Sequence, residues 1–196
     1  MGKRIISQAR GKGGPRYRAR NKNFRFRIQY PHFGGKGKVV KLFNSPIHSA
    51  PLAKILVGKE IFYNPAFKGM IEGQEVSIGE GEAKQGNILA LKDIPLGTLV
   101  YNIESRPGDG GKMIRTGGNS ALLTKRLGKK IGILMPSKKE VWIDENCKAT
   151  IGVIAGHGRL DKPFMKAGKK FHQNKTKGKL WPRTSAVKMN VVDHPF

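Results

Sequence analysis

Residues 105–118 read SRPGDGGKMIRTGG, with five glycines and one proline around Asp109, Lys112 and Arg115. The stretch has too few apolar residues for a strand, so its composition predicts a loop. Because glycine permits positive φ and close approach of the backbone, such a loop is suited to holding phosphate oxygens. The alternative is a mobile turn whose charges face water. A P-loop is excluded, since Arg106 stands at its first glycine position and Met113 follows Lys112.

The charge of the chain points to a polyanionic partner. The 196 residues include 38 Lys and Arg against 13 Asp and Glu, a formal net charge of +25. Nucleic acid is the usual partner of such a protein. Residues 1–59 hold 15 basic and no acidic residues, residues 60–156 hold 13 and 11, and residues 157–196 hold 10 and 2. We therefore expect a near-neutral folded body between two cationic arms.

The cysteine content and the apolar runs of the sequence indicate the cellular compartment. Cys147 is the one cysteine, so no internal disulfide can form and nothing points to an oxidising compartment. There is no apolar run of about 18 residues, and the N-terminal sequence lacks the apolar core of a signal peptide. We expect a soluble, cytoplasmic protein with no membrane partner.

Short β-like runs separated by Pro and Gly turns lie between the arms, and no helical period appears. The first group comprises 38–43, 52–57, 60–64 and 75–79, which suits a small barrel of the OB type. After a bridge at 87–97, the second group comprises 98–104, 120–126, 129–136, 139–144 and 148–156. The spacing therefore predicts an all-β fold with two small barrels in tandem.

The first arm, residues 1–36, alternates Arg with Tyr17, Phe24, Phe26 and Tyr30. This pattern suits an irregular RNA surface, where guanidinium groups meet phosphates and rings stack on exposed bases. RFRIQY has the period of a strand, although its cationic side chains would repel one another. A disordered solubilising tail is the alternative, and in either case we expect the arm to order only on its polyanion.

The closing arm alternates basic clusters with isolated anchors, Phe164, Phe171, Trp181 and Pro182. It has no periodicity that would close a core, so we expect a second arm that threads into RNA. A short helical turn is possible at 167–175, although Gly168 weakens it.

The sequence offers little support for catalysis or metal binding. Cys147 has no neighbouring ligand pair for zinc and suits a buried thiol. Asp193 and His194 resemble part of a triad, but adjacent residues need not face each other. Glu80 and Glu82 suit a solvated edge better than an acid/base pair. We expect no catalytic residue, no metal site and no cofactor.

Five ordered motifs resemble one family. They are PGDGGKMIRTGG (107–118), CKATIGVIAG (147–156), GRLDKPFMKAGKK (158–170), WPR (181–183) and VKMNVVDHPF (187–196), supported by GKRIISQARGKG and SAPLAK near the start. Together they are similar to the universal second protein of the large ribosomal subunit, the ribosomal protein L2 family, in its archaeal and eukaryotic form. The family continues beyond the position of Phe196 through a glycine-rich basic tail.

The resemblance implies an OB-like barrel followed by an SH3-like barrel, with both arms in large-subunit rRNA of the 23S type. The expected domains are a basic arm at 1–36, the barrels at 37–91 and 92–157, and a basic arm at 158–196. It implies a structural, non-enzymatic role near the peptidyl transferase centre that supports subunit assembly, subunit association and translation. Other ribosomal proteins would be neighbours, and no homo-oligomer is expected.

The resemblance and the charge pattern together give the expected rRNA contacts. Arg115 matches an arginine that the family uses on rRNA between its barrels, and His48 falls where many members have arginine. His194 matches a histidine discussed in connection with peptidyl transfer, where we expect it to position rather than to act as an acid or base. The full expected set is Arg10, Arg16, Arg18, Arg20, Arg25, His48, Gly110, Gly111, Lys112, Arg115, Arg159, Lys169, Lys170, Trp181, Arg183 and His194.

Two other classes of protein stay open at this point. One is a free OB-type protein that binds single-stranded nucleic acid or acts as a translation factor, which exposed stacking aromatics on the first barrel would favour. The other is an enzyme with Cys147 or His194 in its active site, which would show a perturbed pKa in a concave pocket.

Overall fold

The computed structural model describes residues 4–196. The contacts within the chain divide it into two compact units. One unit, here called the β body, comprises residues 26–162. The other, here called the terminal unit, combines residues 4–25 with residues 163–196. Each unit is described by itself.

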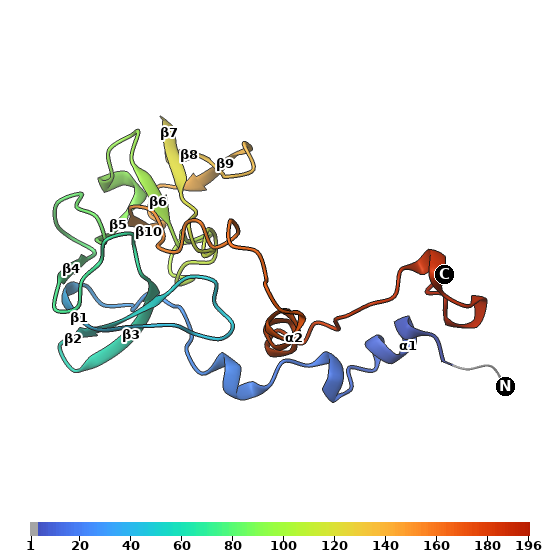
Figure 1. The fold of residues 1–196 in the computed structure, drawn as a ribbon. Helices are drawn as coiled ribbons and strands as arrows, with labels where there is room; N and C mark the ends of the chain where they lie inside the picture. Colours follow the sequence, from blue (N-terminus) through green and yellow to red (C-terminus); the bar gives the residue numbers. More distant parts are fainter. Residues whose placement is uncertain (1–3) are drawn as a thin grey trace. The chain divides into compact units, whose positions relative to one another are not determined.

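The described part of the β body contains ten strands in one sheet, in the order β3-β2-β1-β4-β5-β10-β6-β7-β8-β9 (Figure 1). All neighbouring strands are antiparallel except β4 and β5, which meet in parallel at one residue pair, Ile78 and Ile88. The strands are β1 (Gly35–Phe43), β2 (Leu52–Val57), β3 (Glu60–Pro65), β4 (Glu75–Ile78), β5 (Ile88–Ala90), β6 (Leu99–Tyr101), β7 (Ala121–Leu127), β8 (Lys130–Leu134), β9 (Glu140–Asp144) and β10 (Lys148–Ile151).

Each predicted strand is present, and the predicted bridge contains one more. Residues 87–97 include β5 and a 3-10 turn, Leu91–Asp93. Strand β10 pairs with both β5 and β6, so the end of the second group returns to its beginning. The predicted all-β fold of the OB and SH3-like type is confirmed.

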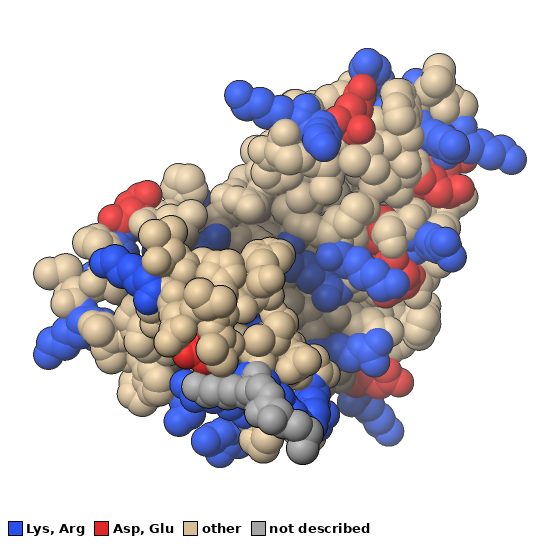
Figure 2. Space-filling model, turned by 90° about the vertical axis from the view of Figure 1, so that its right-hand side faces the viewer, with Lys and Arg blue, Asp and Glu red and all other residues tan. Residues whose placement is uncertain are grey.

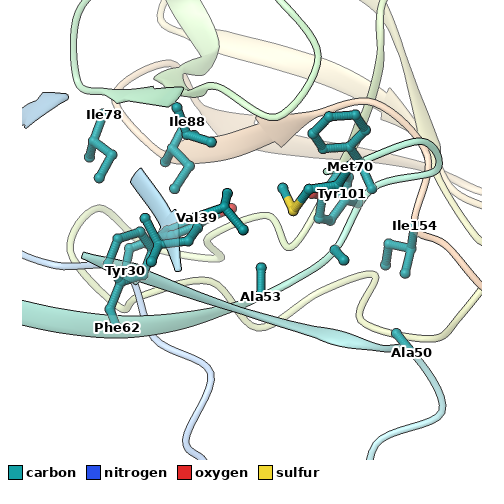
Figure 3. Close-up of a cluster of buried hydrophobic side chains, with 14 of the residues drawn as sticks. Tyr30, Val39, Ala50, Ala53, Phe62, Met70, Ile78, Ile88, Tyr101 and Ile154 are labelled. Carbon is teal, nitrogen blue, oxygen red and sulfur yellow. The ribbon is translucent and has the colours of Figure 1, made fainter. Parts of the chain in front are cut away.

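Two hydrophobic cores lie inside the β body. The first gathers side chains from the early strands, and Figure 3 shows Tyr30, Val39, Phe62 and Ile78 among them. The second is built from β5 to β10 and the segments between them, and it includes Leu123 and Cys147. The members of the first core also include Tyr101 and Ile154, which come from the later part of the chain. The two cores therefore share elements, and the boundary expected between residues 91 and 92 stays a prediction.

The aromatic residues at the start of the β body pack against other residues of the chain. Tyr30 is only 3% exposed. The ring of Phe26 lies 4.6 Å from that of Phe43 and 5.1 Å from that of Tyr63, centroid to centroid. The prediction that Tyr30 stacks on exposed RNA bases is therefore wrong, whereas for the partly exposed Phe26 it stays a prediction. RFRIQY contributes one isolated bridge, from Ile28 to Tyr63, instead of a strand.

The terminal unit has no hydrophobic core. None of its described residues is buried, in contrast to the β body. Its helices are α1 (Ile6–Gly11) and α2 (Ala167–Thr176), with 3-10 turns at Pro15–Tyr17, Asn21–Phe24, Ala186–Lys188 and Val191–Asp193. Helix α2 confirms the predicted helical turn, whereas α1 was not predicted.

Backbone contacts join the two chain segments of the terminal unit, which run beside each other at α2 (Figure 1). The Nδ2 of Asn23 donates to the carbonyl oxygen of Thr176 at 2.8 Å. Gly178 lies so close to residues 17–19 that a Cβ there would be 2.7 Å from the backbone nitrogen of Ala19. The two ends of the chain thus form one unit, held by polar and backbone contacts.

Candidate nucleic-acid interface

The loop at 105–118 contains no strand, as predicted, and its conformation is fixed by two carboxylates. Glu104 is 1% exposed and accepts from the backbone N–H groups of Gly108, Gly110 and Lys148, at 3.2, 3.0 and 2.8 Å. A buried carboxylate with several N–H donors is well satisfied. Glu104 therefore joins the loop to the start of β10.

Asp109 is the second internal acceptor of the loop. Its carboxylate accepts from the backbone N–H groups of Ser105, Arg106 and Gly111, at 3.0, 3.3 and 3.0 Å. Burial alone would raise the pKa of Asp109, but the hydrogen bonds from the Ser105 hydroxyl and from these amides outweigh it and lower the pKa.

The prediction that the loop holds phosphate is wrong for these backbone amides. Five of them, on residues 105, 106, 108, 110 and 111, donate to carboxylates of the chain itself. The ammonium group of Lys112 lies 3.5 Å from Asp109 and its side chain is exposed, so it remains available to an external anion. A contact of Gly110 or Gly111 with RNA stays a proposal and would have to use atoms other than their amide nitrogens.

Arg115 lies at the centre of the contacts around the loop. Its Nε donates to Oδ1 of Asn102 at 2.8 Å, and its Nη2 donates to the carbonyl oxygen of Ile28 at 3.1 Å. Partial burial lowers the pKa of the guanidinium, which stays charged at any physiological pH. Arg115 therefore joins the segment that enters the β body to the segment that precedes the loop.

A buried polar network contacts Arg115 through the side chain of Asn102. The hydroxyl of Tyr30 lies 2.6 Å from the carbonyl oxygen of Asn102 and 2.6 Å from Oγ1 of Thr150. Asn64 donates to Thr150 at 3.1 Å and accepts from Asn102 at 2.8 Å. Burial raises the pKa of the Tyr30 phenol far above its ordinary value, so the ring is a neutral hydrogen-bonding group. Polar networks of this kind fix one arrangement when every member is satisfied.

Two further predicted residues lie in the β body. The Nδ1 of His48 is 2.9 Å from the hydroxyl of Ser45. Burial, and then the charge of Arg115, lower the pKa of His48, so the imidazole is neutral near pH 7. The Nε of Arg159 donates to the carbonyl oxygen of Gly117 at 3.1 Å, at the end of the loop. The structure thus brings His48, Arg115 and Arg159 to the surroundings of one loop.

The terminal unit holds the remaining predicted residues. Its sequence contains 16 Lys and Arg and one acidic residue, Asp193. Figure 2 shows Lys and Arg side chains spread over the visible face of the molecule, with few Asp and Glu. The predicted residues in this unit are Arg10, Arg16, Arg18, Arg20, Arg25, Lys169, Lys170, Trp181, Arg183 and His194.

Several of these predicted residues lie together. Arg10 and Arg183 line one cavity, and Trp181 lines another with three arginines at 16, 18 and 20. The ammonium group of Lys170 is 5.1 Å from the Trp181 ring centroid. His194 accepts at Nδ1 from the backbone N–H of Phe196, at 3.2 Å.

Sequence reasoning missed Lys175 and Lys179, which line the same cavity as Trp181. Lys175 follows Phe171 by one helical turn on α2, and its ammonium group is 5.8 Å from that ring. The spacing of four residues was the available signal. It carried little weight because α2 itself was predicted only as a possible turn.

One rival class, an enzyme with Cys147 as its nucleophile, is disfavoured by the state of that thiol. Burial raises the pKa of the Cys147 thiol to about 12, which opposes formation of a nucleophilic thiolate. Within residues 4–196, no group of three His, Cys, Asp or Glu side chains is arranged to hold a metal ion. In the same residues, no helix has the length and apolar character needed to cross a membrane.

Fold and charge together define an all-β protein with two adjoining cores and a cationic terminal unit that lacks a core. Comparison with known proteins identifies its family. Residues 84–196 match the family described as "Ribosomal Proteins L2, C-terminal domain". The chain is 46% identical to "Large ribosomal subunit protein uL2" of Archaeoglobus fulgidus and 43% identical to that of Korarchaeum cryptofilum. Each match covers 100% of this chain, and 85% and 82% of the relative. The chain belongs to the ribosomal protein L2 family, and its similarity to these archaeal relatives is consistent with the archaeal and eukaryotic form that the motifs predicted.

Proposed function

We propose that this protein is a structural component of the large ribosomal subunit that binds 23S-type rRNA near the peptidyl transferase centre. The observation that carries the proposal is the terminal unit, which has a net charge of +15 and no buried residue. A chain segment without a core cannot offset such self-repulsion internally. Closely spaced phosphates would supply the missing negative charge.

The β body contributes a rigid support in this proposal. Its loop is held by Glu104 and Asp109, so little conformational entropy is lost when the exposed Lys112 meets a phosphate. Neighbouring ribosomal proteins would contact the parts of the surface that RNA leaves exposed. In this role the protein supports assembly, subunit association and translation in the cytoplasm.

The protein catalyses no reaction of its own in this proposal. His194 would lie near the catalytic centre as a positioning residue, because rRNA carries out peptidyl transfer. Its Nδ1 already accepts a hydrogen bond from the backbone of Phe196, which orients the ring. We expect Nε2 to be the nitrogen that meets RNA.

Co-sedimentation with large ribosomal subunits in high salt tests the proposal. We expect the protein to remain with the large subunit after washes that remove loosely bound factors. Recovery in the free fraction, with monodisperse behaviour and tight binding to single-stranded oligonucleotides of any sequence, would instead identify a free OB-type protein.

Arg115 gives a prediction at the level of one residue. Arg115→Ala should weaken binding to rRNA by roughly 10- to 100-fold, because it removes a charge-assisted donor and releases the segment at Ile28. Lys177→Ala, at an exposed position of the terminal unit, should cost less than about 5-fold. Filter binding to a large-subunit rRNA fragment measures both.

Arg115→Lys is the control, because it keeps the charge without the planar fork that reaches both Asn102 and Ile28. We expect it to resemble Arg115→Ala more than the unmodified protein. Equal losses for Arg115→Ala and Lys177→Ala would remove the central role of this residue.

A further inference from the structure

Three cavities lie within the terminal unit and share walls. The first, of about 350 Å³, and the second, of about 320 Å³, both include Lys179 and Leu180 in their linings. The second and the third, of about 200 Å³, both include Arg20 and Lys175. The three cavities therefore form a row along the contact between the two chain segments.

The linings combine cations with flat rings. The first cavity has the ring of Tyr17, the second has those of Phe171 and Trp181, and the third has the imidazole of His172. Every cavity also has at least two Lys or Arg side chains, and no described carboxylate lines any of them. The row is suited to a ligand that alternates negative charge with planar groups.

The second cavity, here called the central cavity, has the most rings and the most cations in its lining. Phe171 is 40% exposed although it is a large apolar side chain, so one part of its ring has no protein cover. Arg16, Arg18 and Arg20 approach from the other chain segment. Its volume lies at the lower end of the roughly 300–1,000 Å³ typical of small-molecule sites.

The ammonium groups of two lysines lie close to these rings. The ammonium groups of Lys175 and Lys170 lie 5.8 Å from the Phe171 centroid and 5.1 Å from the Trp181 centroid. A base that stacks on either ring would bring its own phosphate within reach of the neighbouring ammonium group. Simple neutralisation of phosphate would not require exposed rings beside the cations.

We infer that the terminal unit binds a short run of unpaired RNA nucleotides, with one base stacked in the central cavity beside Phe171 and Trp181. Arg16, Arg18, Arg20 and Lys179 hold the flanking phosphates. The inference rests on the proposed function, since it names the form of RNA that the cationic terminal unit takes. It differs from a purely electrostatic contact because a base, and not only the backbone, contributes to affinity.

A fluorescence titration of the full-length chain tests the inference. The chain has two tryptophans, Trp142 on β9 and Trp181, so Trp142→Phe leaves Trp181 as the one reporter. The probes are a five-nucleotide adenosine RNA and the same RNA with an abasic central residue, which keeps every phosphate. We expect the intact RNA to quench Trp181 and to bind roughly 5- to 150-fold more tightly than the abasic RNA, the range for one stacked base.

Phe171→Leu and Phe164→Leu form a matched pair of variants. Both residues are exposed and belong to the terminal unit, but Phe164 does not line the central cavity. Phe171→Leu should reduce the preference for the intact RNA several-fold, whereas Phe164→Leu should leave it unchanged.

Equal affinity for the intact and abasic RNA would overturn the inference, as would equal effects of the two variants. Failure of the proposed function gives a different result, because the protein would then not sediment with large subunits. Stable incorporation into subunits together with no base preference would remove only this inference.

Discussion

Affinity for large-subunit rRNA should fall about 10,000-fold as monovalent salt rises from 50 to 200 mM. The reason is counterion release, because each phosphate neutralised by Lys or Arg frees condensed cations from the RNA. Contact with about eight phosphates gives a slope of roughly −6 to −7 in a plot of log affinity against log salt. The 16 Lys and Arg residues of the terminal unit make that number of contacts readily attainable.

Filter binding across a salt series measures the slope, and one pair of variants tests where it originates. Arg18→Gln removes one cation and should make the slope less steep by about one. Arg18→Lys retains the charge and should keep the slope of the unmodified protein. A flat salt response would count heavily against an rRNA-binding role.

Gly111→Ala should destabilise the β body by about 2–4 kcal/mol. Gly111 has φ of +82°, and an added Cβ would lie 2.5 Å from the carbonyl oxygen of Asn102. The alanine must therefore accept an unfavourable backbone conformation and also displace the backbone of Asn102, which is part of the buried polar network. Urea unfolding followed by Trp142 fluorescence, with Trp181 replaced by Phe, reports on the β body alone.

Gly108→Ala is the matched control for this substitution. Gly108 has φ of +81°, almost the same as Gly111, but an added Cβ would have no other atom within 4 Å. It should cost only about 1 kcal/mol, the conformational part of the effect. If both variants lost the same stability, the close approach to Asn102 would not contribute.

The strands were largely predictable from local pattern. Short runs of β-branched, aliphatic and aromatic residues located β2, β3 and β9 to within one residue of their observed bounds. Strand β5 was hidden because it is only three residues long and lies directly before a 3-10 turn. A strand this short depends on its partner β10, which local sequence does not reveal.

The residue types expected at the site could be proposed from the sequence, but the contacts among those residues could not. The Lys and Arg residues of the arms were proposed from charge, since a polyanion requires no particular geometry, whereas Arg115 was proposed from the family resemblance. Tyr30 was misassigned because its neighbours are cationic, whereas its burial depends on Asn102 and Thr150, which are distant in sequence. Glu104 was not predicted either. It accepts hydrogen bonds from the loop amides, and no rule of sequence spacing would identify those bonds.

The terminal unit, built from both ends of the chain, has a consequence for biosynthesis. Residues 4–25 leave the synthesising ribosome before the β body, but their partner residues 163–196 follow only after it. At roughly 5–20 residues per second, the interval is on the order of ten seconds. Throughout that time the nascent N-terminal segment lacks its polar and backbone contacts with the cationic residues 163–196. Its positive charge stays open to cellular polyanions before and after that pairing, so timely capture by an escort protein or by precursor rRNA would protect it from misdirected association.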